Sequence, residues 1–293
     1  MTELAIGIDG GGTSCRAAIA DRNGTIIGRG KSGPANILSD LDNSLLNIAD
    51  SARQALRDAG LAAETISSVA AVVGVAGANV TDYGQRIEKA LPFAEGRVVT
   101  DALIALQGAL GDADGIVGAF GTGSVYNARK DGRLNGIGGW GFVVGDQASG
   151  ARLGRDLMER SLLAHDGVRP ASPITDAVMA EYGNDPEHIV EFAHSARPTD
   201  FARYAPVVFE HAAKGDAVAV GIVTDAATAI GESLEALLWP NCPSICLLGG
   251  LAEAYEPWLS RYRPLLAKPK NDALHGAVEL AVKLLNERQR GSA

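Results

Sequence analysis

The sequence predicts an α/β protein with two halves of similar architecture, each built on a mixed β-sheet. Both halves open in the same order of strand, Gly/Thr-rich turn, strand, turn and strand, starting near residues 4 and 115. Stretches with helical spacing of apolar residues follow each opening. The 293 residues, 46% hydrophobic and 21% charged, are enough to bury a core without disulfides. The repeat is one of architecture rather than of sequence.

The first half begins with a β-like stretch, Leu4–Ile8, followed by a glycine-rich turn over 9–13. A helix is expected over 41–59, because its apolar residues recur at helical spacing and Gly60 follows them. The other strands of this half are expected over 15–20, 25–29, 69–73 and 97–100, and the other helices over 85–91 and 101–110.

The second half repeats the opening and then becomes mainly helical. Strands are expected over 115–120, 125–129, 134–137 and 245–248, and helices over 149–164, 174–181, 201–214, 217–238 and 276–285. We expect a first domain over 1–113 and a second over 114–270, with a helical insert at 161–214. The terminal segment 271–293 is expected to pack back on the first domain.

Composition narrows the classes of function. The net charge is −9 and no dense run of Lys or Arg occurs, so nucleic acid is not an expected partner. No uninterrupted apolar stretch reaches the ~18 residues of a membrane helix, and no signal peptide is visible. Three cysteines (Cys15, Cys242 and Cys246) are too few and too poorly spaced for a disulfide framework or a zinc site. We therefore expect a cytoplasmic protein with small, buried cysteines.

Two glycine-rich turns, Asp9–Thr13 and Gly121–Ser124, are the strongest chemical signal. Glycines let backbone N–H groups converge on an anion, and a Thr or Ser hydroxyl adds a donor. Their strand–turn–strand setting excludes Rossmann and Walker A loops, which run from a strand into a helix. One such turn is ordinary hairpin chemistry, but two at matching positions could hold one polyphosphate from both sides.

Six segments in order make the chain resemble the sugar-kinase, actin and heat-shock-chaperone ATPase superfamily. Within it, the chain is similar to BadF/BadG-type ATPases, which include N-acetylglucosamine kinase and bacterial glucosamine kinase. The segments are Ile6–Thr13, Asn36, Thr100-Asp101, Gly121–Ser124, Gly138–Gly141 with Gly145-Asp146, and Leu248–Gly250. The Gly-Gly-Trp-Gly and Gly-Asp combination is the most discriminating.

This resemblance implies two duplicated RNase H-like (actin-like ATPase) domains with the active site in the cleft between them. ATP and Mg²⁺ are the implied cofactors and a small-molecule amino sugar the implied substrate, with a homodimer left open. The implied reaction transfers phosphate from ATP to the 6-hydroxyl of N-acetylglucosamine.

Asp101 is the expected catalytic base. By position alone, at a strand end before a helix, it would be an N-cap whose pKa the helix N-terminus lowers. The resemblance implies that it orients and deprotonates the sugar hydroxyl. A low pKa need not prevent this, because in a loose phosphoryl-transfer transition state positioning counts more than basicity.

The resemblance also implies metal, nucleotide and sugar ligands. Asp9 would hold Mg²⁺, although alone it reads as a turn-stabilising residue. The ATP-binding residues would be Gly11, Gly12, Thr13, Gly121, Thr122, Gly123, Gly249 and Gly250. The sugar-binding residues would be Asn36, Asp101, Ser124, Gly139, Trp140, Gly141 and Asp146. Asp146 could equally cap the helix that begins near Ser149.

Two departures from the family pattern affect the substrate. Val125 stands where some N-acetylglucosamine kinases place an Asn that contacts the sugar, and Gln147 stands where Glu is common. Glucosamine is therefore an alternative acceptor. An alternative of another class is an ATP-driven activator of an acyl-CoA dehydratase, for which Cys242 and Cys246 are the only cluster-like pair.

Overall fold

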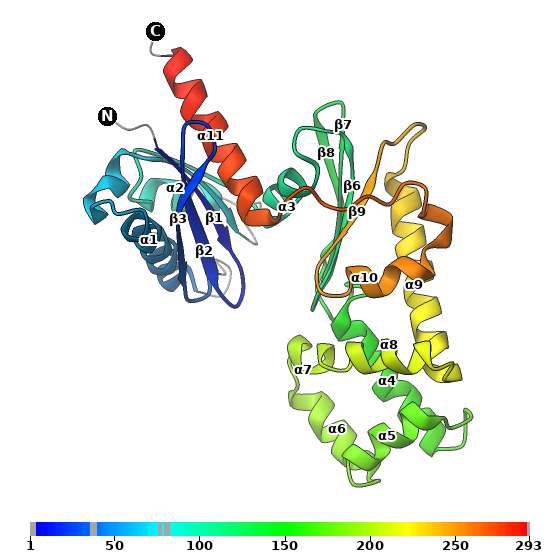
Figure 1. The fold of residues 1–293 in the computed structure, drawn as a ribbon. Coiled ribbons are helices and arrows are strands. Elements are labelled where there is room, and N and C mark those ends of the chain that lie inside the picture. The colour runs from blue at the N-terminus through cyan, green and yellow to red at the C-terminus, as the bar shows by residue number, and fades with distance from the viewer. Residues whose placement is uncertain (1–3, 36–39, 76–77, 79–82, 292–293) are drawn as a thin grey trace. The chain divides into compact units, whose positions relative to one another are not determined.

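The computed structural model describes residues 4–35, 40–75, 78 and 83–291 (Figure 1). The chain divides into two compact units. Unit 1 comprises residues 1–113 and 269–293, and unit 2 comprises residues 114–268. Each unit holds one mixed sheet among its described residues.

The sheet of unit 1 has the strand order β3-β2-β1-β4-β5. The strands are β1 (Leu4–Gly10), β2 (Cys15–Asp21), β3 (Ile26–Ser32), β4 (Ala70–Val75) and β5 (Glu95–Thr100). β1, β2 and β3 form an antiparallel meander, whereas β4 and β5 run parallel to β1. The carboxyl ends of β1, β4 and β5 therefore meet at one edge of the sheet.

Helices cover both faces of this sheet. They are α1 (Leu41–Asp58), α2 (Tyr83–Ala90), α3 (Asp101–Leu110) and α11 (Ala273–Gly291), with a 3₁₀ turn η1 (Ala63–Ser68). The side chains of β1 point alternately to the two faces of the sheet. Ile6 and Ile8 pack in the core that α1 covers, and Ala5 packs in the core beneath α11. All three side chains are fully buried.

Glycines let α11 approach its neighbours at backbone distance. A Cβ at Gly7 of β1 would lie 2.2 Å from the Val278 nitrogen, and one at Gly276 would lie 2.0 Å from the Ile104 oxygen of α3. No side chain fits in such a gap, so α11 rests directly on β1 and α3. This contact holds α3, and with it Asp101, against the end of the sheet.

The sheet of unit 2 repeats the plan in the order β8-β7-β6-β9. Its strands are β6 (Gly115–Phe120), β7 (Ser124–Lys130), β8 (Arg133–Gly138) and β9 (Ile245–Leu248). β6, β7 and β8 form the antiparallel meander, and β9 is parallel to β6. The predicted internal repeat is confirmed.

The helices of unit 2 pack around one large core. They are α4 (Gly150–His165), α5 (Pro173–Glu181), α6 (Pro186–Ser195), α7 (Pro198–Ala202), α8 (Ala205–Ala213), α9 (Ala217–Leu237) and α10 (Ala252–Tyr255), with 3₁₀ turns η2 (Glu256–Trp258) and η3 (Ser260–Tyr262).

Two expectations in the helical insert were wrong. The single helix expected over 201–214 is two helices, α7 and α8, with Pro206 in the first turn of the second. Proline fits only the first turn of a helix, so it marks a new start. α6 was not expected at all, although Pro186 follows its N-cap Asp185 in the same way.

α9 is the one described helix long and apolar enough to cross a membrane by length and composition. Its residues Ile222, Ile230 and Leu234 are buried in the core of unit 2. The core accounts for this apolar face, since a core helix passes the same test of length and hydropathy.

Candidate active site

The β1–β2 turn presents open backbone. Within it, the Gly11 N–H donates to the Ser14 oxygen at 3.0 Å, and the Gly11 oxygen accepts from the Ala35 N–H at 2.9 Å. Gly12 and Thr13 are exposed at the tip. The Thr13 hydroxyl has no hydrogen bond among the described residues, so it remains available as a donor.

The matching β6–β7 turn is tied to the start of α4. The Gly121 N–H donates to the Gly123 oxygen at 3.0 Å. The Gly121 and Thr122 oxygens accept from the Gly150 and Ala151 N–H groups at 2.8 and 3.2 Å. These contacts hold the carbonyl groups toward α4 and leave Gly121 and Thr122 exposed on the other side.

Three glycines have no reason in the protein itself to be glycine. Among the glycines whose surroundings the structure describes, only Gly12, Gly121 and Gly250 combine a φ outside the left-handed range with an empty Cβ position. An alanine would fit each site without strain. Each belongs to a different one of the three segments expected to bind ATP.

Gly249 differs from its neighbour. It has a φ of 90°, and a Cβ there would lie 2.2 Å from the Phe120 oxygen. The turn after β9 thus packs directly on the end of β6, and the Leu251 N–H donates to the same oxygen at 3.2 Å. Gly249 shapes the turn, and Gly250 stands open beside it.

Asp9, the expected metal ligand, lies at the end of β1 and pairs across the sheet with Arg16. The Arg16 guanidinium donates to Asp9 Oδ2 at 2.6 Å and to Asp272 Oδ2 at 3.0 Å. The sequence analysis missed Arg16. The expected hairpin could have indicated it, because its two strands place Arg16 opposite Asp9. Arg16 fixes the Asp9 carboxylate through Oδ2, and Oδ1 accepts no hydrogen bond from the part of the chain that the structure describes.

A single carboxylate can serve a magnesium site. No group of three His, Cys, Asp or Glu side chains in the described part of the chain could hold a metal ion by itself. Mg²⁺ usually binds through one or two carboxylates, with waters and substrate phosphates completing its shell. Asp9 Oδ1 beside the open β1–β2 turn fits that mode.

Asp101 is the first residue of α3, and Thr100 rather than Asp101 is the N-cap. The Thr100 hydroxyl accepts from the Leu103 N–H at 3.2 Å. Asp101 Oδ1 accepts from the adjacent Ala102 N–H at 2.9 Å, and no side chain among the described residues donates to this carboxyl group. The N-cap interpretation was therefore wrong, and the carboxyl group of Asp101 is left for another partner.

The pKa of Asp101 is raised, not lowered as the helix N-terminus suggested. Loss of water around the carboxyl group raises it most, and the negative charge of Asp9 adds to this, while the Ala102 N–H lowers it. The two carboxyl groups stand at the same edge of one sheet, beyond β1 and β5. A raised pKa makes Asp101 a better proton acceptor than a typical surface aspartate.

The loop between β8 and α4 carries most of the residues expected to bind sugar. Gly139 and Gly141 have φ values of 71° and 85°, and Asp146 has 55°. The Trp140 side chain is 78% exposed. It is not a core tryptophan.

The same loop is bonded to the phosphate turn beside it. The Ser124 hydroxyl donates to the Gln147 oxygen at 2.6 Å. Asp146 is buried against Gly123, where a Cβ would lie 2.8 Å from its Oδ2. The hydroxyl proton of Ser124 is therefore used in a hydrogen bond within the protein and is not available to donate to a sugar. Asn36 lies outside the described residues.

Arg152 is a second residue that sequence reasoning missed, and its position offered no signal. Its Nη1 donates to the Gly145 oxygen at 3.2 Å, immediately before Asp146. Its Nε is buried without a hydrogen-bond partner in the described part of the chain. Arg152 therefore holds the β8–α4 loop through its hydrogen bond to the Gly145 oxygen.

The expected residues gather in two groups, one in each unit. Unit 1 brings together Asp9, Asp101 and the turn 11–13 at one sheet edge. Unit 2 brings together the turns 121–124 and 249–250 and the loop 139–146.

Comparisons with known proteins identify the family. The family model of the BadF/BadG/BcrA/BcrD ATPases matches residues 6–273. The chain belongs to this ATPase family. It is 37% identical over 280 residues to the glucosamine kinase of Vibrio cholerae serotype O1, covering 95% of each chain. It is 27% identical over 255 residues to the N-acetyl-D-glucosamine kinase of Dictyostelium discoideum, covering 80% of this chain and 79% of the relative.

A solved structure shows the same fold. The chain superposes on a protein from Chromobacterium violaceum, provisionally named an N-acetylglucosamine kinase, with a TM-score of 0.86. The two are 32% identical, and the match covers 96% of this chain and 99% of the other. The expected actin-like ATPase fold is confirmed.

We expect alanine at Gly12, Gly121 or Gly250 to leave the fold intact and to weaken ATP binding. An alanine fits these conformations, so stability should change by less than about 1 kcal/mol. A methyl group against the phosphates or base should raise the Kd for ATP at least tenfold, as measured by calorimetry. The matched control is Gly249→Ala, which should destabilise the protein by about 2 kcal/mol or more. Unchanged ATP affinity in all three open-site variants would refute a ligand at these turns.

We expect Asp101→Asn to melt at or above the wild-type Tm at pH 7. Because the folded pKa is raised, Asp101 favours the fold below its unfolded pKa, and this contribution is lost as pH rises through the folded pKa. The neutral amide avoids that loss, so the gain should disappear near pH 4. Thermal melts at both pH values measure it, and a lower Tm for the variant at pH 7 would contradict the raised pKa.

Proposed function

We propose that the protein is an ATP-dependent amino sugar kinase that phosphorylates the 6-hydroxyl of its substrate. The main support is that three glycines in the segments expected to bind ATP have an empty Cβ position. These are Gly12, Gly121 and Gly250. The carboxyl group of Asp101, partly shielded from water, supplies a base with a raised pKa. The relatives named as glucosamine and N-acetylglucosamine kinases support the substrate class.

ATP would be held mainly by backbone. The N–H groups of the two turns and the hydroxyls of Thr13 and Thr122 would donate to phosphate oxygens. Gly250 would lie against the adenosine. Asp9, held by Arg16, would bind Mg²⁺, which when present neutralises the charge of the phosphates.

Asp101 would accept a hydrogen bond from the 6-hydroxyl and take its proton as the bond to phosphorus forms. Its second oxygen accepts from Ala102, which limits its rotation and fixes its direction. Catalysis of this kind depends on positioning and on charge neutralisation. Placing both substrates requires the two units to present their groups to one space, as proposed for an interdomain cleft.

The sugar would lie against the β8–α4 loop. The exposed indole of Trp140 offers an apolar face, and Asp146 offers hydrogen-bond acceptors. Arg152 keeps this loop in place through the Gly145 oxygen. Asn36 is proposed as a further sugar ligand on the grounds of the motif alone.

The acceptor is either glucosamine or its N-acetyl form. The 37% identical relative favours glucosamine, whereas the 32% identical solved structure favours N-acetylglucosamine, the acceptor the motif suggested. Val125 is half-buried and packs 3.3 Å from the Cβ position of Gly139. An apolar group there suits an acetyl methyl group, while a free ammonium needs acidic or carbonyl oxygen atoms.

The activator of an acyl-CoA dehydratase has less support. Cys242 and Cys246 are 5% and 1% exposed. The Cys242 thiol donates to the Ser244 oxygen, and burial raises its pKa. A buried thiol with a raised pKa is a poor ligand for an iron–sulfur cluster shared between subunits. We further propose that the protein acts in the cytoplasm on a small-molecule substrate and that it binds neither nucleic acid nor a membrane.

The test is ADP release across a panel of glucosamine, N-acetylglucosamine and glucose. We expect sugar-dependent ADP release, with an amino sugar giving the highest kcat/KM, and at least a tenfold lower kcat for Asp101→Asn, since general base catalysis typically contributes about 10²–10⁴-fold. Product analysis should place the phosphate on the 6-hydroxyl. ADP release that is independent of any sugar, or a variant that keeps full kcat, would refute the proposal.

A further inference from the structure

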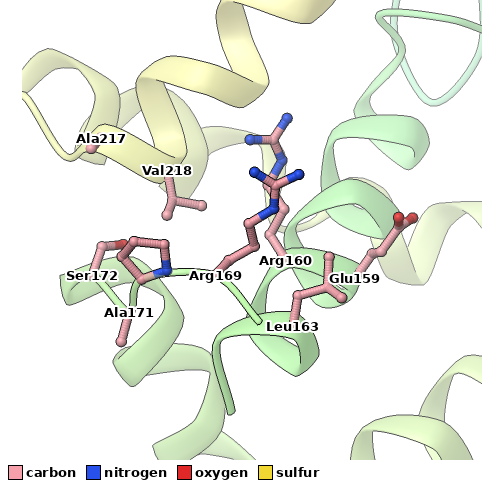
Figure 2. Close-up of a pocket in the computed structure, with 9 residues that line it drawn as sticks. Glu159, Arg160, Leu163, Arg169, Ala171, Ser172, Ala217 and Val218 are labelled. Carbon is pink, nitrogen blue, oxygen red and sulfur yellow. The ribbon is translucent and has the colours of Figure 1, made fainter. Parts of the chain in front are cut away.

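Unit 2 has a cavity of about 550 Å³ that the kinase reaction does not use (Figure 2). It lies between the C-terminal half of α4, the segment that follows it and the start of α9. Its wall combines apolar side chains, among them Leu163 and Val218, with two arginines, Arg160 and Arg169, and one carboxylate, Glu159. Its volume lies within the usual range for small-molecule sites.

Arg160 is held in place from two sides. Its guanidinium donates to Asp225 Oδ2 of α9 at 2.6 Å. It also lies over Gly221, where a Cβ would come within 2.9 Å of Nη1. Glycine is a poor residue for the interior of a helix. Its presence in α9 gives the Arg160 guanidinium the room to lie there.

Arg169 lacks a counter-ion. Its side chain is exposed and has no hydrogen bond or ion pair among the described residues. Figure 2 shows its guanidinium extending in the same direction as that of Arg160, while the Glu159 carboxylate points elsewhere. A positive charge thus stands free at a cavity in a chain whose net charge is −9.

The buried carboxylate of Asp216 cannot supply the missing charge, because its oxygens already accept hydrogen bonds. Asp216, the N-cap of α9, accepts from the Val218 and Ala219 N–H groups, the Ser172 hydroxyl and the Ile174 N–H. Asp225 already pairs with Arg160. The two arginines and these two carboxylates leave the guanidinium of Arg169 open to an external anion.

We propose that this cavity binds an organic phosphate monoester. Guanidinium groups match phosphate oxygens in pairs of parallel hydrogen bonds. Arg169 would supply the unpaired positive charge, and the N–H groups of Arg160 that do not bond to Asp225 would donate to the same phosphate. The phosphate would lie on Arg160 and Arg169, and the organic part would cover Leu163 and Val218. The cavity is several times larger than a phosphate group, which is why a monoester rather than free phosphate is its ligand.

The cavity is separate from the candidate active site. The first turn of α4 bonds to the β6–β7 turn, and Arg160 is ten residues further along the helix, about 15 Å away at 1.5 Å per residue. Binding here therefore does not depend on the proposed kinase function. It can be measured without ATP and without turnover.

The test is calorimetric titration of the full chain with glucose 6-phosphate and, separately, with inorganic phosphate. Wild-type protein should bind the monoester saturably and at least tenfold more tightly than phosphate. Arg169→Ala should weaken monoester binding at least tenfold. Arg155→Ala removes the same charge from an exposed position on the same helix and should change the affinity by less than twofold.

Gly221→Ala provides an independent variant. It should weaken binding by displacing the Arg160 guanidinium, although alanine favours the helix, so a folding defect would not explain the loss. Three results would overturn the proposal: no monoester binding by the wild type, equal binding by Arg169→Ala, or an equal loss in Arg155→Ala. Tighter binding of inorganic phosphate than of the monoester would overturn the assignment of an organic ligand.

Discussion

Uncovered backbone at three turns is the feature on which the rest of the site depends. At Gly12, Gly121 and Gly250 neither the conformation nor the neighbours require glycine, and the space that a Cβ would occupy is empty. Free N–H groups in a turn bind anions well, because they need no reorganisation to receive charge. The strands before these turns are buried and regular, so the turns are presented on a rigid base.

Charged side chains lie near the glycine turn of unit 1. Arg16 bridges Asp9 and Asp272. It orients the Asp9 carboxylate through Oδ2, and Oδ1 has no hydrogen bond among the described residues. Asp101 keeps its proton more tightly because it is partly dehydrated and faces the charge of Asp9. The close packing of α11 on α3 through Gly276 holds this pair in place. In unit 2, the bond from Ser124 to Gln147 joins the phosphate turn to the loop proposed for the sugar.

Much of the fold could be predicted from the sequence, because β-branched runs and glycine turns specify strands locally. The helix over 101–110 was also placed correctly. Local patterns failed where tertiary packing decides. Pro206 was read as lying within a helix, when it begins α8. The raised pKa of Asp101 also escaped prediction, since it depends on how closely Asp9 and other atoms approach across the sheet edge. Arg152 was missed because its partner, the Gly145 oxygen, is a backbone atom of an irregular loop.

Hydrogen exchange with a non-hydrolysable ATP analogue tests most directly whether the glycine turns of both units bind one nucleotide. Amides at 11–14, 121–124 and 249–251 should exchange more slowly on addition of the analogue, and all three segments should follow a single saturation curve. Protection confined to the turns of one unit, or two curves with different midpoints, would contradict this account.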